Sequence, residues 1–93
     1  MNPLLFYEDK DKRTVFVRNL PYTVDENTLQ CLNYFECASE IRLARDKETG
    51  KVRGFANVEF KTPEMAEDCV AVIESMGGLE VEGRKVYCEI QIV

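Results

Sequence analysis

Aromatic, basic and amide side chains alternate along the segment KVRGFANVEF, residues 51–60. In an extended strand, successive side chains point to opposite faces. One face of this segment is apolar and suits a protein core, whereas the other carries Arg53, Phe55 and Asn57 among charged neighbours. A flat ring can stack on an unpaired nucleic-acid base, and an arginine can contact a phosphate. The segment therefore predicts a strand whose solvent face binds a single-stranded nucleic acid.

Two other segments add side chains of the same kinds. In TVFVRNL, residues 14–20, alternation places Phe16 and Arg18 on one face. Near the end of the chain, in KVYCEI, alternation places Lys85 and Tyr87 on one face. If these strands lie beside residues 51–60, their rings and cations form one continuous surface.

The elements that must position these residues follow a simple order. The β-branched and alternating stretches predict strands, and the two amphipathic stretches between them predict helices. The strands span residues 14–20, 39–45, 51–60 and 84–92, and the helices begin after Thr23 and after Thr62. The order βαββαβ is that of the ferredoxin-like fold. We predict an α+β sandwich in which two helices pack on one face of a four-stranded antiparallel sheet and leave the other face open.

Local signals mark the ends of both helices. The tetrapeptide TVDE predicts a capping box in which Glu26 reaches back to Thr23. Thr62 followed by Pro63 predicts the start of the second helix, and a Gly-Gly pair predicts its end. The residues expected to be buried are Leu29, Leu32 and Phe35 in the first helix and Ala66, Cys69, Val70, Ile73 and Met76 in the second.

Two segments resemble the signatures of the RNA-recognition motif (RRM) family. VFVRNL, residues 15–20, matches the hexamer signature at every position, and RGFANVEF, residues 53–60, matches the octamer signature at all but the fifth. The resemblance covers residues 14 to about 91. It implies that Phe16 stacks under one base and that Phe55 packs against the sugars between two nucleotides. It also implies that Arg53 reaches a phosphate.

The departure from the octamer signature falls at Asn57, where the family usually has an aromatic ring. Without a replacement ring, stacking worth about 1–3 kcal/mol is lost. The strand order 4-1-3-2 implied by the resemblance makes Tyr87 a neighbour of Phe16, so Tyr87 can partly replace the ring. Alternatively, the Asn57 amide forms hydrogen bonds with a base edge and exchanges stacking for selectivity.

The net charge of −5 hides two opposed charge distributions. Residues 23–36 and 62–82 contain nine acidic residues and no lysine or arginine, whereas the remainder of the chain has a net charge of +4. Arg42 and Lys51 flank the expected hairpin between the second and third strands and are further candidates for phosphate contacts. Two ordinary surface roles are the alternative. Arg53 could form an ion pair with Glu59, and the cations of the hairpin could simply be solvated.

Several classes of function are not supported by the sequence. The chain has no histidine, which removes the commonest general base, and its four cysteines lack the CxxC spacing of a zinc site. We therefore expect a protein that is not an enzyme and that binds neither a metal nor a cofactor. No apolar run has the length of a membrane span, and the cysteine pattern indicates an intracellular protein. The family resemblance implies a nuclear, ribonucleoprotein setting.

We divide the chain into a leader, residues 1–13, and an RRM domain, residues 14–93, and expect a monomer. The predicted function is binding of single-stranded RNA by stacking and phosphate contacts, within a larger RNA-processing protein. Two alternatives remain at this stage. The apolar patch of the leader could cover the sheet, or the RRM fold could bind a protein partner through its acidic helices.

Overall fold

The computed structural model describes residues 12–90, so most of the predicted leader and residues 91–93 lie outside the described part. The elements, in chain order, are β1 Thr14–Arg18, α2 Glu26–Gln30, the 3₁₀ helix η2 Asn33–Phe35, β2 Glu40–Arg45, β3 Val52–Glu59, α3 Pro63–Ser75, β4 Leu79–Val81 and β5 Arg84–Ile90. Among the described residues, no helix is both long enough and apolar enough to cross a membrane.

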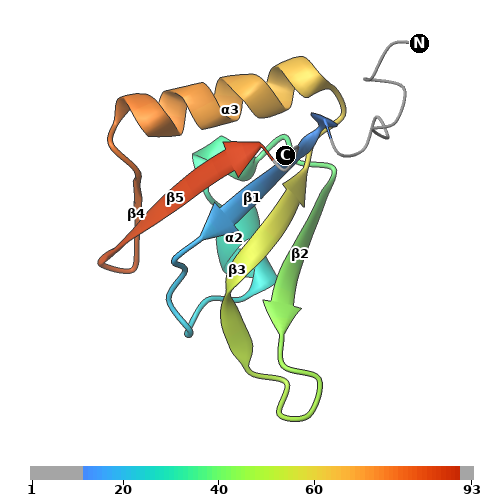
Figure 1. The fold of residues 1–93 in the computed structure, drawn as a ribbon, viewed down its shortest axis with the longest axis vertical. Helices are drawn as coiled ribbons and strands as arrows, with labels where there is room; N and C mark the ends of the chain where they lie inside the picture. The colour runs from blue at the N-terminus through green and yellow to red at the C-terminus, as the bar shows by residue number, and fades with distance from the viewer. Residues whose placement is uncertain (1–11, 91–93) are drawn as a thin grey trace, which may run out of the picture.

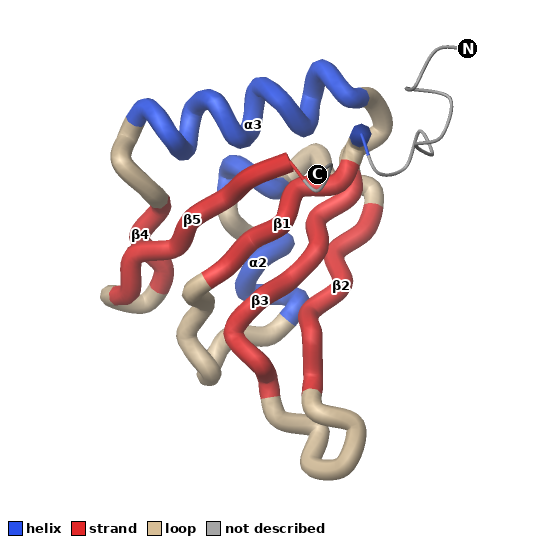
Figure 2. Tube along the Cα trace, in the orientation of Figure 1, coloured by secondary structure: helices blue, strands red, loops and turns tan. Residues whose placement is uncertain are grey.

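The strands form one antiparallel sheet in the order β2-β3-β1-β5-β4. Both helices lie on the same face, with α2 behind β1 and β3 and with α3 along one end, as Figures 1 and 2 show. The predicted α+β sandwich is therefore confirmed. The sheet has five strands rather than four, because the segment read as a loop before β5 folds back on it as the short strand β4.

The core lies between the sheet and the helices, as alternation predicts. The inward residues of the strands are Val15, Val17, Ala56, Val58 and Val86, and all of them are fully buried. Leu29, Phe35, Ala66 and Ile73 cover them from the helical side and are equally buried. This packing fixes the register of β1 and β3, since a shift by one residue would turn the apolar set toward water.

The first helical segment begins at a different cap from the one predicted. Asp25, not Thr23, is the N-cap, and its carboxylate accepts a hydrogen bond from the backbone N–H of Thr28 at 2.8 Å. This bond, together with one from the Thr28 hydroxyl, holds the pKa of Asp25 below its usual value. The Thr23 hydroxyl instead donates to Glu82 at 2.7 Å, so the predicted capping box is wrong.

The second helix agrees more closely with its prediction. The Thr62 hydroxyl accepts from the backbone N–H of Met65, Pro63 is the first helical residue, and two glycines with positive φ follow the helix. Met76 was expected in the core, but 45% of it is exposed. It lies at the C-cap of α3, and its sulfur accepts a hydrogen bond from the Tyr34 hydroxyl.

The four cysteines are free thiols, two of them buried and two exposed. Burial raises the pKa of Cys69 to about 11 and that of Cys88 to about 12. Cys31 and Cys37 are exposed on the helical side. Within residues 12–90 no group of His, Cys, Asp or Glu side chains could hold a metal ion.

Candidate nucleic-acid interface

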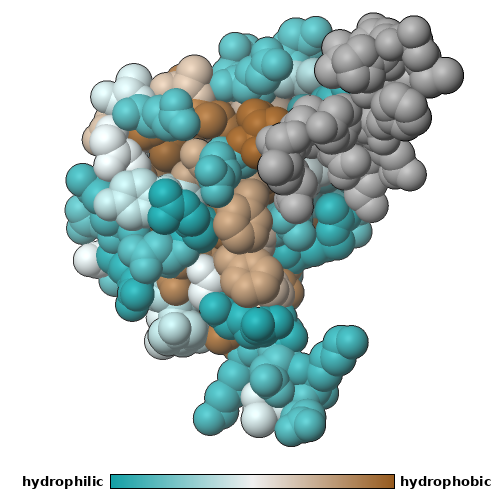
Figure 3. All heavy atoms as spheres, in the orientation of Figure 1, coloured by the Kyte–Doolittle hydropathy of each residue, from teal (hydrophilic) through white to brown (hydrophobic). Residues whose placement is uncertain are grey.

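Phe16 and Phe55 form an aromatic pair on the open face of the sheet. Their ring centroids are 5.7 Å apart and their planes are inclined by 46°. In the register of β1 and β3, Phe55 is opposite Arg18 and Phe16 is opposite Asn57, so the two rings are diagonal neighbours. Both phenylalanines are half-buried. Figure 3 shows apolar surface in the middle of this face with hydrophilic surface on both sides.

Asn57 occupies the position at which the octamer signature has a second base-stacking ring. It is opposite Phe16 in β1 and opposite Arg42 in β2. Its Oδ1 atom is buried and accepts no hydrogen bond from any residue that the structure describes. The amide thus places an unused acceptor beside the aromatic pair, and an unsatisfied buried acceptor costs about 1–3 kcal/mol.

Tyr87 extends the aromatic surface across β5. Its register partner in β1 is Arg18, not Phe16, although β5 does adjoin β1 as expected. The Arg18 guanidinium carbon is 4.9 Å from the Tyr87 ring centroid. The Nε atom of Arg18 is also 3.9 Å from the Glu89 carboxylate, with both side chains more than half exposed. Such exposed ion pairs are weak, so Arg18 can exchange this partner for a phosphate.

Arg53 is the cation best placed to contact a phosphate beside the rings. Its guanidinium carbon is 5.3 Å from the centroid of Phe55. Among the described residues no carboxylate lies within 4.0 Å of its guanidinium, although its charge helps to lower the pKa of Asp46, and the alternative pairing with Glu59 is not formed. Its charge therefore remains available at the edge of the aromatic pair.

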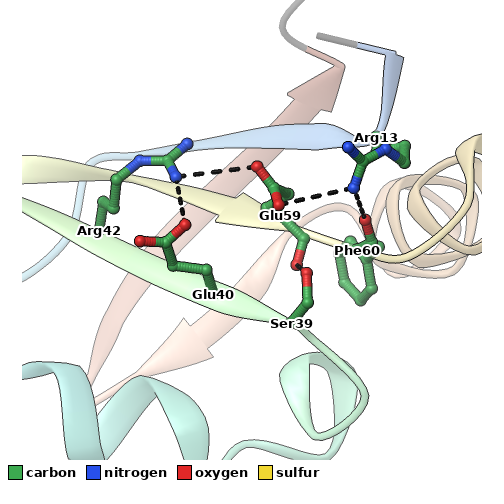
Figure 4. Close-up of polar contacts among 6 residues, drawn as sticks. All are labelled: Arg13, Ser39, Glu40, Arg42, Glu59 and Phe60. Carbon is green, nitrogen blue, oxygen red and sulfur yellow. Dashed lines mark hydrogen bonds and ion pairs between the residues drawn. The ribbon is translucent and has the colours of Figure 1, made fainter. Parts of the chain in front are cut away.

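Arg42, in contrast, is held by carboxylates. Its Nη1 atom is 2.7 Å from Glu40 and 3.8 Å from Glu59. Glu59 is also 3.5 Å from Arg13, whose guanidinium donates to the carbonyl oxygen of Phe60 at 2.9 Å. Figure 4 shows that these groups form one network across β1, β3 and β2. Arg42 is thus on the predicted face but already neutralised.

The two predicted lysines lie at the margins. Lys51 is exposed at the end of the β2–β3 turn. Asp46 organises this turn, and the backbone N–H groups of Thr49 and Glu48 lower its pKa by donating to its carboxylate. Lys85 is exposed, but its methylene stem lies against Gly78 at the β4 side of the sheet. Neither lysine touches the aromatic pair.

The sequence reading missed one aromatic residue, Tyr22, which is 67% exposed in the loop between β1 and α2. It also missed Arg84, whose guanidinium carbon is 6.0 Å from the Tyr22 ring centroid. The sequence feature that could have revealed Tyr22 is its position directly after Pro21, outside any predicted amphipathic pattern. Asn19 directly follows β1 and has a positive φ of 68°.

A pocket of about 270 Å³ opens beside Tyr87, between β5 and the end of α3. Glu74, Glu89 and Arg18 are among its lining residues, so two carboxylates stand against one guanidinium. Two carboxylates disfavour a phosphate at this position. The anionic backbone of a nucleic acid is therefore better accommodated on the side of Arg53.

Comparisons with known proteins agree with this geometry. Residues 15–87 match the sequence model described as RNA recognition motif. Nucleolin of Gallus gallus is 46% identical over 77 residues, which cover 83% of this chain and 10% of that protein. RNA-binding protein 34 of Homo sapiens is 38% identical over 78 residues, covering 82% of this chain and 17% of that protein. The chain thus spans only a small part of these relatives.

Solved structures share the architecture. The second RRM domain of yeast poly(U)-binding protein superposes with a TM-score of 0.70 at 26% identity. The match covers 86% of this chain and 94% of that one. The two domains therefore share one fold.

Proposed function

The chain belongs to the RNA recognition motif family, and from this membership we propose that it binds single-stranded RNA on the open face of its sheet. The observation that carries the proposal is the half-buried pair of Phe16 and Phe55 with the unpaired Arg53 beside it. Two relatives, RNA-binding protein 34 and yeast poly(U)-binding protein, are named for RNA binding, and this supports the proposal.

In this proposal, Phe16 stacks under one base and Phe55 packs against the sugars of two adjoining nucleotides. Each stacked base contributes about 1–3 kcal/mol. Arg53 binds a phosphate beside Phe55, and Arg18 leaves Glu89 to bind another. The aromatic face spans roughly two to four nucleotides. Tyr87 lies at one margin of this track and provides a further surface for a base.

In this proposal Asn57 lowers the affinity of the site for RNA, because it supplies no ring, and makes the site selective among bases, because its amide can form hydrogen bonds. It offers one acceptor and two donors, which can pair with the edge of a base but cannot stack on its plane. The base over Phe16 is its nearest partner, because Asn57 is opposite Phe16 in the sheet. Selectivity then comes from the amide, whereas affinity comes from the aromatic pair and the phosphate contacts.

The acidic helices direct RNA to the sheet. Five carboxylates of the helical side have no cationic partner among the described residues; they belong to Glu36, Glu64, Glu67, Asp68 and Glu74. Repulsion from these groups disfavours binding of a polyanion to the helical face. The domain acts as a monomeric binding module, not an enzyme. In this proposal it works within a larger RNA-processing protein in the nucleus, and its similarity to nucleolin and RNA-binding protein 34 supports that setting.

A groove on the helical side favours a second function, binding of a protein partner. A cavity of about 250 Å³ lies between η2 and α3, and its lining includes Tyr34, Met65, Val72 and Asp68. Val72 is 47% exposed. A peptide with an apolar residue between basic residues matches both the groove and the surrounding charge. RNA and such a peptide would occupy opposite faces.

Chemical-shift perturbation in the ¹⁵N-labelled domain tests the first function. Short random-sequence RNA is added at low salt and again at about 0.15 M ionic strength. We expect shifts at Phe16, Phe55, Arg53 and their strand neighbours, weaker at the higher salt and lost in the double variant Phe16→Ala, Phe55→Ala. Shifts confined to α3 and η2 would point to the helical groove instead. A silent sheet at millimolar RNA would overturn the proposal.

A further inference from the structure

Tyr22 and Arg84 form a third aromatic–cationic pair, which lies at the end of the sheet and apart from the two pairs on the open face. Tyr22 is 67% exposed, the largest exposed fraction among the large apolar residues of the described chain. It is neither part of the core nor part of the open face. Its ring instead lies beside the Arg84 guanidinium, whose carbon is 6.0 Å from the ring centroid.

The Tyr22 ring is held in place by the backbone of β3. A Cβ atom built on Gly54 would lie 3.4 Å from Cε1 of Tyr22 and 3.5 Å from the carbonyl oxygen of Leu20. The backbone N–H of Leu20 donates to the carbonyl of Gly54 at 2.8 Å. Gly54 directly precedes Phe55, so the loop that carries Tyr22 is attached to β3 next to the aromatic pair.

Asn19 holds Arg84 in a defined position. The Asn19 Oδ1 atom accepts from Nε and Nη2 of Arg84 at 3.3 and 3.0 Å. Its Nδ2 atom donates to the carbonyl oxygen of Lys85 at 2.7 Å. Asn19 thus joins the end of β1 to the start of β5. Three of the five N–H donors of the guanidinium remain available after these bonds.

Arg84 also retains its charge. No carboxylate within residues 12–90 pairs with it, whereas Arg18, Arg42 and Arg45 each have an acidic partner. A hydrogen bond from Thr23 to Glu82 at 2.7 Å closes the loop against the turn that precedes Arg84. The pair is therefore preorganised, which reduces the entropy cost of binding.

We propose that Tyr22 and Arg84 form an additional nucleotide subsite, in which a base stacks on the Tyr22 ring and Arg84 binds the adjoining phosphate. The inference rests on the proposed function. Arg84 alternates with Val86 and so leaves β5 on the helical side, about 10 Å along the strand from Tyr87. RNA that crosses the open face reaches the subsite only by continuing past the end of β1. A short oligonucleotide fills the sheet first, and a longer one fills both.

The test compares two fluorescently labelled random-sequence RNAs of about four and about eight nucleotides, the first matched to the span of the sheet. Fluorescence anisotropy gives the affinity of each for the wild type, Tyr22→Ala, Tyr22→Phe and Arg84→Gln. We expect Tyr22→Ala to weaken the longer RNA about 5- to 100-fold and to leave the shorter one unchanged. Tyr22→Phe keeps the ring and should bind both as the wild type does.

For Arg84→Gln we expect the slope of log affinity against log salt to fall by about 1 for the longer RNA only. Lys61→Gln removes a charge from an exposed position just before α3 and is the matched control, expected to leave this slope unchanged. Arg84→Lys keeps the charge, and thermal melting shows whether each variant is folded. These controls separate loss of a phosphate contact from loss of the Asn19 hydrogen bonds.

If the wild type binds both RNAs and Tyr22→Ala does not weaken the longer one, the subsite is overturned and the sheet site is left intact. Equal weakening of both RNAs would also overturn it, because the ring would then serve the sheet site. If Phe16→Ala with Phe55→Ala has no effect on either RNA, the proposed function fails instead. The two failures are therefore distinguishable.

Discussion

Asn57 lies directly opposite Phe16 in the register of β1 and β3, so an amide and an aromatic ring share one row of the open face. The Oδ1 atom of this amide is buried without a hydrogen-bond partner among the described residues. The row therefore combines one aromatic ring with one amide whose acceptor is unsatisfied. This relationship makes position 57 the most informative single substitution on the sheet.

We expect Asn57→Phe to strengthen binding of random-sequence RNA by about tenfold or more, because a second ring supplies stacking worth about 1–3 kcal/mol. The differences in affinity among oligo(U), oligo(A) and oligo(C) should narrow, since the amide donors and acceptor are lost. Isothermal titration calorimetry measures both effects, with Asn57→Ala as the control that adds no ring. Weaker binding of Asn57→Phe to every oligonucleotide would contradict this role.

Arg53 and Arg42 should differ in their effect on the salt dependence of RNA binding. Arg53 has no carboxylate partner within the described part of the chain, whereas Arg42 is 2.7 Å from Glu40. We expect Arg53→Gln to reduce the slope of log affinity against log salt by about 1. Arg42→Gln should change it little, because its charge is already compensated. The opposite ranking would place the phosphates over β2.

Gly78→Ala should destabilise the domain more than Gly83→Ala. Both glycines have positive φ, 117° and 83°, so alanine is strained at either position. A Cβ on Gly78 would lie 2.9 Å from Cγ of Lys85 and 3.2 Å from the carbonyl oxygen of Val86, whereas a Cβ on Gly83 meets nothing within 4 Å. We expect a cost of about 1–2 kcal/mol at Gly83 and more at Gly78. Urea unfolding with equal m-values gives the difference, and equal costs would refute the steric argument.

The buried thiols make stability fall in alkaline solution. Burial raises the pKa of Cys69 to about 11 and that of Cys88 to about 12, whereas an unfolded thiol titrates near 8.5. Between about pH 9 and 11 the unfolded chain therefore loses protons that the folded chain retains, and the free energy of unfolding decreases.

Urea unfolding across this pH range measures the decrease, and Cys88→Ala should flatten the profile. Labelling by a thiol reagent at neutral pH should modify Cys31 and Cys37 at once and the buried pair only on unfolding. Rapid labelling of all four thiols in the folded domain would contradict the burial.

The alternating strands and the two signature segments predicted the fold and the positions of Phe16, Phe55 and Arg53 on one face, because strand periodicity is a local property. The partners of the cations were not predictable. Whether Arg42 or Arg53 finds a carboxylate depends on Glu40 and Glu59, which the sheet brings together from different strands.

The same limit explains the incorrect helix cap. Thr23 and Asp25 are both good N-caps, and the choice depends on Glu82, which lies 59 residues from Thr23 in the chain and accepts its hydroxyl. The strand β4 was missed because its pairing with β5 extends over only three residues and carries no strong periodic signal. The exposure of Tyr22 was not predicted because a loop has no regular period that would indicate which of its side chains face solvent.

The separation of charge gives this domain a permanent electric dipole. Unpaired carboxylates lie on the helical side, whereas Arg53 lies beside the rings of the open face and Lys51 is exposed at the end of the adjoining β2–β3 turn. In the field of a polyanion such a body experiences a torque that turns its cationic side forward before contact. Productive encounters are thereby selected during diffusion, even though the chain as a whole carries the same sign of charge as its proposed ligand.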